Sequence, residues 1–281
     1  MPIAFLCPVP AVRARAQASP EASLSDVLAA GTRDVHAASD ALIRAKAPLA
    51  FSDPALWTQL LSQFFYVYRA LEDALDQGAS RDARVHALHA PFFSRLARSH
   101  AFLADIAFHG GGRPLAPPLP QTAAYVVAVS ALATAKPLLL VAYAQTLYLA
   151  LLAGGQALDK LLRGAMLLPP GRGSALFDFS AALPAEERER FRRALKAAVD
   201  ALGEGLTSEE RTSLLQEKRS IFWRNDAIIA AVLKDARGSL LFAWLRVLRA
   251  VFLSLRRYLL ALLALLIAVI ALLAQHRRVR V

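Results

Sequence analysis

Several features are scarce or missing in this chain of 281 residues, and each narrows the possibilities. The single cysteine, Cys7, cannot form a disulfide within the chain, which favours a reducing compartment. No window alternates apolar and polar residues as a half-buried strand does. The sequence also lacks zinc-finger spacing, a glycine-rich phosphate loop and an internal repeat. These absences exclude a disulfide scaffold and the commonest sequence-readable metal and phosphate sites.

Acidic residues are absent from the last part of the chain, residues 236–281, which carries eight arginines. Residues 1–235 have 25 basic and 22 acidic side chains, so most of the net charge of +11 belongs to this end. Residues 236–257 mix arginines with large apolar residues, a pattern typical of a helix lying on anionic lipid. The same mixture argues against nucleic-acid binding, because the basic residues do not line a polar face.

Charge of either sign is missing from residues 258–274, which read YLLALLALLIAVIALLA. A helix of this length spans about 25 Å, and arginines flank it on both sides. We interpret the run as a transmembrane tail anchor followed by a basic tail, residues 275–281; a buried core helix is the alternative. The body is then expected in the cytosol, with the endoplasmic reticulum as the membrane and the mitochondrial outer membrane as the other candidate.

Apolar residues make up 56% of the chain, and the abundant Ala and Leu favour helix. Residues 1–23 are rich in proline and are expected to form a disordered leader. Helical periodicity dominates residues 24–235, which predicts a single all-α domain. The expected helices are 23–45, 54–78, 91–108, 122–135, 136–168, 184–202 and 208–235, with a loop over 169–183.

Two adjacent glycines, Gly154 and Gly155, interrupt the longest of these expected helices. Each costs about 1 kcal/mol relative to Ala inside a helix. The pair therefore indicates a kink, or a close approach to the backbone by another group. That group is either a flat ligand or a neighbouring helix, and the glycines alone do not choose between them.

His36 lies within the first expected helix, with Asp40 one turn later. A carboxylate that holds one ring nitrogen orients the imidazole for metal binding through the other. The chain's other histidines form no ligand cluster with it, and a lone axial histidine suits a haem iron. An ordinary surface or core histidine is the alternative reading.

Five segments together resemble the haem oxygenase family, in its eukaryotic membrane-anchored form. The segment LVAYAQTLYLALLAGGQ, residues 140–156, matches the family signature at 11 of 17 positions. Supporting segments are GTRDVH, YVYRALEDAL, LADIAF and KRSIFWRN. Their order and spread make the resemblance specific, and it covers residues 24–235.

The resemblance implies that His36 is the metal ligand, with Asp40 holding its far nitrogen. It implies that Gly154 and Gly155 belong to a distal helix bent over the other haem face, where they leave room for oxygen. The remaining residues placed by the resemblance are Arg33, Gln145, Arg192 and Lys196 at the haem propionates, and Tyr68 and Asn225 in a distal water network.

The distal helix departs from the family pattern at several positions that matter chemically. Leu151 stands where the family has an Asp that holds the proton-delivering water network, and Leu has no group that relays a proton. Ala150 and Leu147 replace a Gly and an Arg. Gln145 stands where a propionate-binding Tyr is usual.

Three hypotheses therefore remain open at this point. The first is an enzyme that converts haem to biliverdin, carbon monoxide and iron. Its electrons would come from NADPH only indirectly, through a flavoprotein reductase of the cytochrome P450 reductase type on the same membrane. The second is a catalytically degenerate relative that binds or senses haem. The third is a membrane-anchored helical scaffold without haem.

Overall fold

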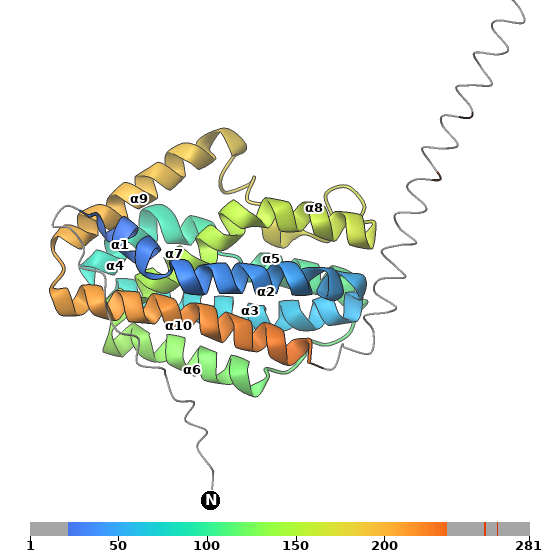
Figure 1. The fold of residues 1–281 in the computed structure, drawn as a ribbon, viewed down its shortest axis with the longest axis horizontal. Helices are drawn as coiled ribbons and strands as arrows, with labels where there is room; N and C mark the ends of the chain where they lie inside the picture. Colours follow the sequence, from blue (N-terminus) through green and yellow to red (C-terminus); the bar gives the residue numbers. More distant parts are fainter. Residues whose placement is uncertain (1–21, 235–255, 257–262, 264–281) are drawn as a thin grey trace, which may run out of the picture.

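The computed structural model describes residues 22–234 and the single residues Arg256 and Leu263. Apart from those two, the expected juxtamembrane segment, tail anchor and basic tail lie outside the described residues, as does nearly all of the expected leader. Within residues 22–234 every regular element is helical, which confirms the all-α domain (Figure 1).

Ten α-helices follow one another along residues 22–234. They are α1 (Leu24–Gly31), α2 (Arg33–Ser52), α3 (Pro54–Ala79), α4 (Ala83–Leu88), α5 (Ser99–Gly110), α6 (Pro120–Ala135), α7 (Leu140–Leu149), α8 (Gly155–Met166), α9 (Arg188–Glu204) and α10 (Ser208–Val232). Two π-helical turns accompany them, His89–Phe93 and Ala150–Gly154. The short 3-10 turns are Ser94–Leu96, Pro137–Leu139, Ala175–Phe177 and Ala185–Glu187.

Local sequence sets several of the helix starts. Asp53 caps α3 by accepting a hydrogen bond from the Ala55 amide, and Pro54 occupies the first turn, where its missing N–H is not needed. Thr207 and Glu210 form a reciprocal capping box at the start of α10. These signals are readable in the sequence, and the predicted starts of both helices are confirmed.

The helix α3 forms the centre of the domain and packs against α5, α6 and α7. The segment Pro137–Met166 is also long and apolar enough to cross a membrane, but 72% of its most apolar window is buried inside the domain. This segment is therefore a core element of the fold, and α10 and α2 flank it.

The expected single helix over 23–45 is wrong in two respects. It breaks at Thr32, next to Gly31, where a Cβ would come within 2.6 Å of Leu215 on α10. The glycine thus allows the end of α1 to approach α10 closely. The second part, α2, continues through Pro48 to Ser52. Pro48 is exposed, and packing of its buried neighbours Leu49 and Phe51 outweighs the lost backbone hydrogen bond.

Two further boundaries differ from expectation. The expected helix 91–108 is instead divided: its first residues belong to the first π-helical turn and to the 3-10 turn Ser94–Leu96, and α5 begins only at Ser99. Glu72 on α3 accepts hydrogen bonds from the amides of Arg98 and Ser99, which fixes this break through a contact distant in sequence. The expected helix 136–168 is divided by the second π-helical turn, which lies where the glycine pair predicted an irregularity.

Candidate functional site

His36 lies near the start of α2, and its side chain is 60% exposed. Nδ1 lies 3.8 Å from Asp40 Oδ2, which is within ion-pair range but longer than a hydrogen bond. The ring meets the ring of Phe222 on α10 edge-on, with the centroids 5.5 Å apart. Nε2 has no hydrogen-bond or ion-pair partner within residues 22–234. The imidazole is thus restrained on two sides and free to bind a metal through Nε2.

The helix α8 lies beside α2, and the π-helical turn Ala150–Gly154 leads into it (Figure 1). The two glycines of this region have different surroundings. A Cβ at Gly155 would come within 2.9 Å of the Phe177 ring, whereas a Cβ at Gly154 would meet no atom within 4 Å. Packing therefore accounts for Gly155, and Gly154 leaves open space beside the backbone.

Tyr68 on α3 is buried and reaches the segment that contains the glycines. Its hydroxyl donates a hydrogen bond to the Leu147 carbonyl, 2.9 Å away, in the last turn before the π-helical turn. Burial raises the pKa of Tyr68 above its ordinary value, so the hydroxyl stays protonated and acts as a donor. This contact places Tyr68 behind the distal segment as a support for its backbone.

The position of Leu151 offers no polar group, since its side chain packs against the apolar core. Two polar atoms on the neighbouring helices have no partner, however. Thr146 Oγ1 on α7 and Asn225 Oδ1 on α10 are buried and make no hydrogen bond within the described residues. Buried polar atoms are almost always satisfied, so both orphaned atoms fit hydrogen bonding to water or to a ligand.

The predicted propionate-binding cations lie on two helices, α2 and α9. Arg33 is exposed on α2, one turn before His36. Lys196 lies on α9, where Nζ is 2.8 Å from Asp200 Oδ2 and 3.4 Å from Asp26 Oδ1. Lys196 is therefore already paired, whereas Arg33 has no side-chain partner within residues 22–234.

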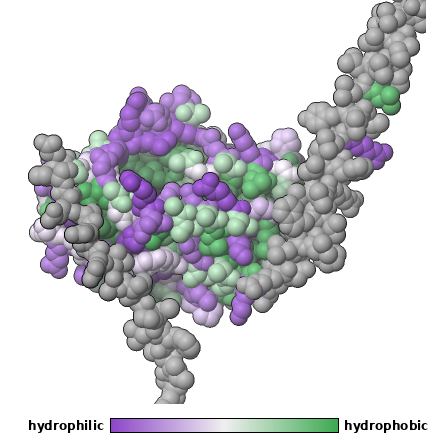
Figure 2. Space-filling view, viewed as in Figure 1, coloured by the Kyte–Doolittle hydropathy of each residue, from purple (hydrophilic) through white to green (hydrophobic). Residues whose placement is uncertain are grey.

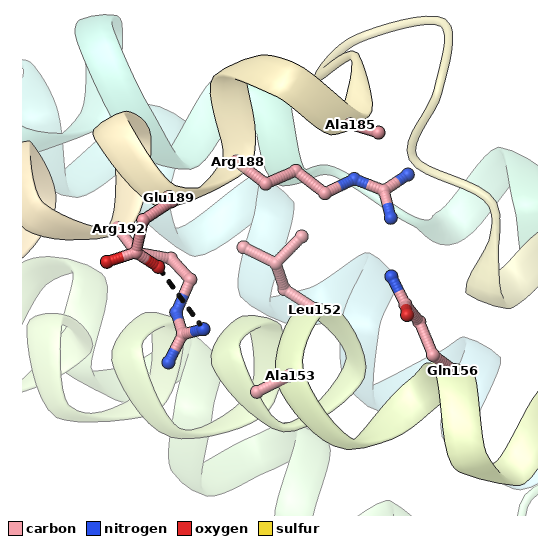
Figure 3. A pocket seen from close by; sticks show the side chains of 7 residues that line it. All are labelled: Leu152, Ala153, Gln156, Ala185, Arg188, Glu189 and Arg192. Carbon is pink, nitrogen blue, oxygen red and sulfur yellow. Dashed lines mark ion pairs between the residues drawn. The ribbon is translucent and has the colours of Figure 1, made fainter.

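Arg192 lines a hollow of about 290 Å³ between α9 and the π-helical turn (Figure 3). Arg188 and Arg192 extend from α9 towards Leu152 and Ala153, and Arg192 Nη1 lies 3.8 Å from Glu189 Oε2. Figure 2 shows hydrophilic residues gathered along the top of the molecule, where α9 runs. The hollow thus has a basic wall on α9 and an apolar floor.

These features can be compared with those of known proteins. A family model described as heme oxygenase matches residues 22–231. The chain belongs to the haem oxygenase family. Its fold is similar to heme oxygenase 2 from Chlamydomonas reinhardtii, solved without heme, with a TM-score of 0.69 and 30% identity over 75% of this chain and 98% of that one.

A second haem oxygenase structure is that of heme oxygenase-2 from Synechocystis sp. PCC 6803 in complex with heme and NO. The alignment covers 80% of this chain and 92% of the Synechocystis chain, with 25% identity and a TM-score of 0.70. In sequence, heme oxygenase 2 from Synechocystis is 32% identical over 146 residues, or 51% of this chain and 57% of that protein. Several alignments span less than two thirds of the curated relatives' length.

One contact was not anticipated from the sequence or from the haem oxygenase signature. Gln145 is buried on α7, and its Oε1 accepts a hydrogen bond from Lys218 Nζ on α10, 3.1 Å away. The sequence pattern could have indicated this position of Lys218. It lies one turn before Phe222 and one turn after Leu214, both of which are buried residues of the same helix. A lysine in that apolar register predicts a buried ammonium group.

Proposed function

We propose that the chain binds haem between α2 and the α7–α8 segment and opens the ring to biliverdin, carbon monoxide and iron. The observation that carries the proposal is the combination of a restrained, accessible imidazole at His36 with the open space at Gly154 on the adjoining segment. Family membership and the heme-bound structure of a relative support it.

The residues present fit haem as the bound group. His36 Nε2 would hold the iron from the α2 side, with Asp40 near the other ring nitrogen. The missing side chain of Gly154 would let a flat ring lie close to the distal backbone. When bound, haem supplies the iron centre at which oxygen is activated. Electrons would come from NADPH through a flavoprotein reductase.

The distal side chains would hold water and position the helix. Since Leu151 relays no proton, the orphaned Thr146 Oγ1 and Asn225 Oδ1 are the groups that would anchor water beside the ligand. Tyr68 supports the distal backbone through the Leu147 carbonyl. Proton delivery would therefore depend on neutral groups, which orient water but do not exchange a proton as a carboxylate does.

A hemin titration of the full chain tests the binding step. We expect a Soret band for the wild type and for His86→Ala, a control in an exposed histidine on α4. His36→Ala should lose the axial imidazole signature and bind hemin about ten-fold or more weakly. A wild-type chain without a Soret band, or a His36→Ala spectrum identical to it, would overturn the proposal and leave the helical scaffold.

Turnover is tested separately on the haem-loaded chain. Biliverdin should form with NADPH and a cytochrome P450 reductase-type flavoprotein, and catalase should not suppress it. Haem binding without biliverdin formation would favour the second function, a protein that binds or senses haem. The apolar side chain of Leu151 at the position of the family's acid supports that function specifically.

We further propose that the body is tail-anchored with its domain in the cytosol, at the endoplasmic reticulum or at the mitochondrial outer membrane. The uncharged run 258–274 and its flanking arginines support this placement. Alkaline carbonate extraction of cell membranes should retain the full chain and release a chain ending at residue 257. Release of both would contradict the anchor.

A further inference from the structure

Lys218 presents an unusual electrostatic situation on the face of α10 that meets α7. Its side chain is largely buried, and within residues 22–234 its only hydrogen bond goes to the neutral amide of Gln145, at 3.1 Å. Burial lowers the pKa of the ammonium group to about 8. Buried charges are normally paired, and one neutral acceptor offsets only part of the desolvation cost.

The acidic groups on the neighbouring turns do not supply the missing partner. Glu217 on the same helix lies 3.0 Å from the Arg224 guanidinium. Asp34 on α2 forms a two-point pair with Arg219, with both contacts at 2.7 Å. Each acid is thus satisfied by an arginine, and Lys218 has no anion of its own.

The location of Lys218 relates it to the proposed haem site. Phe222, one turn later on α10, contacts the His36 ring on α2, and Lys218 contacts Gln145 on α7. One turn of α10 therefore connects the helix that carries the iron ligand with the helix that leads to Gly154. Gln145 Nε2 donates to no described residue, so it is a second available donor beside the ammonium.

We propose that Lys218 on α10 is a further binding residue for one haem propionate, beside Gln145, which the family resemblance already places at the propionates. This inference rests on the proposed function and adds a binding residue from α10. A propionate would accept hydrogen bonds from Lys218 Nζ and Gln145 Nε2, giving the ammonium its counter-ion in a partly desolvated place. Charge-assisted hydrogen bonds of this kind are the stronger ones in proteins. The chain thus carries a partly buried cation whose counter-ion would be supplied by the ligand.

The test compares two ligands and two variants of the full chain. Hemin carries both propionates, whereas hemin dimethyl ester presents the same ring and iron without carboxylates. Lys218→Met keeps the length of the side chain and removes its charge. Lys136→Met is the control, because Lys136 is exposed at the end of α6 and its side chain makes no hydrogen bond or ion pair within residues 22–234.

We expect Lys218→Met to weaken hemin binding about ten-fold or more, which corresponds to the loss of one charged hydrogen bond. The same substitution should change the affinity for the dimethyl ester by less than about two-fold, since no carboxylate is present. Lys136→Met should bind both ligands as the wild type does. The Soret titration measures all six constants and needs no turnover.

Two results would overturn the inference while leaving the proposed function intact. One is equal hemin affinity in the wild type and Lys218→Met, with the His36-dependent Soret band retained in both. The other is an equal loss for hemin and its ester, which would make Lys218 a packing residue. A wild-type chain that shows no Soret band would instead remove the proposed function and this inference together.

Discussion

The hydroxyl of Tyr68 lies 2.9 Å from the main-chain carbonyl of Leu147 and donates a hydrogen bond to it. The acceptor lies in the last turn of α7, immediately before the π-helical turn Ala150–Gly154. A wide turn disturbs the regular pairing of backbone groups, and a side-chain donor can compensate for that. Tyr68 therefore links the central helix α3 to the place where the distal segment changes direction.

Tyr68→Phe should destabilise the chain by about 1 kcal/mol, because the Leu147 carbonyl loses its side-chain donor and keeps the Ala150 amide. It should also weaken hemin binding, since the distal segment loses a support. Tyr66→Phe is the matched control: its hydroxyl bonds the Ala116 carbonyl in the loop between α5 and α6. Thermal unfolding and Soret titrations measure both effects. Equal hemin affinity for the two variants would contradict a supporting role for Tyr68.

Alanine at the two glycines should have opposite effects on stability. Gly154→Ala should stabilise the haem-free chain by about 0.5 to 1 kcal/mol, because helix propensity improves and the methyl group meets nothing. Gly155→Ala should destabilise it by about 1 to 3 kcal/mol, because the methyl group collides with Phe177. These changes are read from the unfolding temperature of each variant.

Hemin titrations of the same two variants test whether the haem ring lies against the backbone of the distal segment. Gly154→Ala should bind hemin more weakly despite its greater stability, because its methyl group enters the space assigned to the ring. Unchanged hemin affinity in Gly154→Ala would place the ring elsewhere.

Leu151→Asp should raise biliverdin yield per haem, because the carboxylate can hold and exchange protons with distal water. The same change should cost about 1 to 3 kcal/mol of stability, since Leu151 packs against the apolar core. Leu151→Asn has a similar shape without the acid and serves as the control. Equal yields for Asp and Asn, measured by biliverdin absorbance in the presence of catalase, would contradict the proton-relay argument.

The stability of the haem-free chain should depend on pH through Lys218. Its pKa is about 8 in the folded chain against an ordinary value of 10.5, so the folded state binds fewer protons between these values. The contribution of Lys218 to the free energy of unfolding is therefore lowest below pH 8 and rises by about 1 to 3 kcal/mol towards pH 10.5. Lys218→Met should remove this rise and be the more stable chain at pH 7.

Of the groups facing Lys218, Gln145 is neutral and Glu217 is paired with Arg224. Burial raises the pKa of Tyr143, so at about pH 10 the unfolded chain loses this proton before the folded chain does, and stability falls there equally in the wild type and Lys218→Met. The difference between the two chains therefore reports Lys218. Denaturant unfolding of both chains from pH 7 to 10.5 measures the difference. Parallel pH profiles for the wild type and Lys218→Met would contradict the assignment.

The sequence predicted the helical domain and several of its elements because their signals are local. Pro54 and the capping pair Thr207–Glu210 mark helix starts through contacts within one turn, and the structure confirms both. The approach of Leu215 on α10 to Gly31 at the end of α1 could not be predicted, because it depends on a contact between residues far apart in the chain. The start of α5 likewise depends on Glu72 of α3.

The candidate site shows the same division. The sequence by itself determined the chemistry: a histidine with a carboxylate one turn later, a glycine pair in an apolar helix, and a leucine where the family has an acid. Only the tertiary structure decided that Gly155 serves packing while Gly154 faces open space, that Lys196 is already paired, and that Lys218 meets Gln145. Helical periodicity gives the face on which a residue lies, but which helix covers that face is decided by long-range packing.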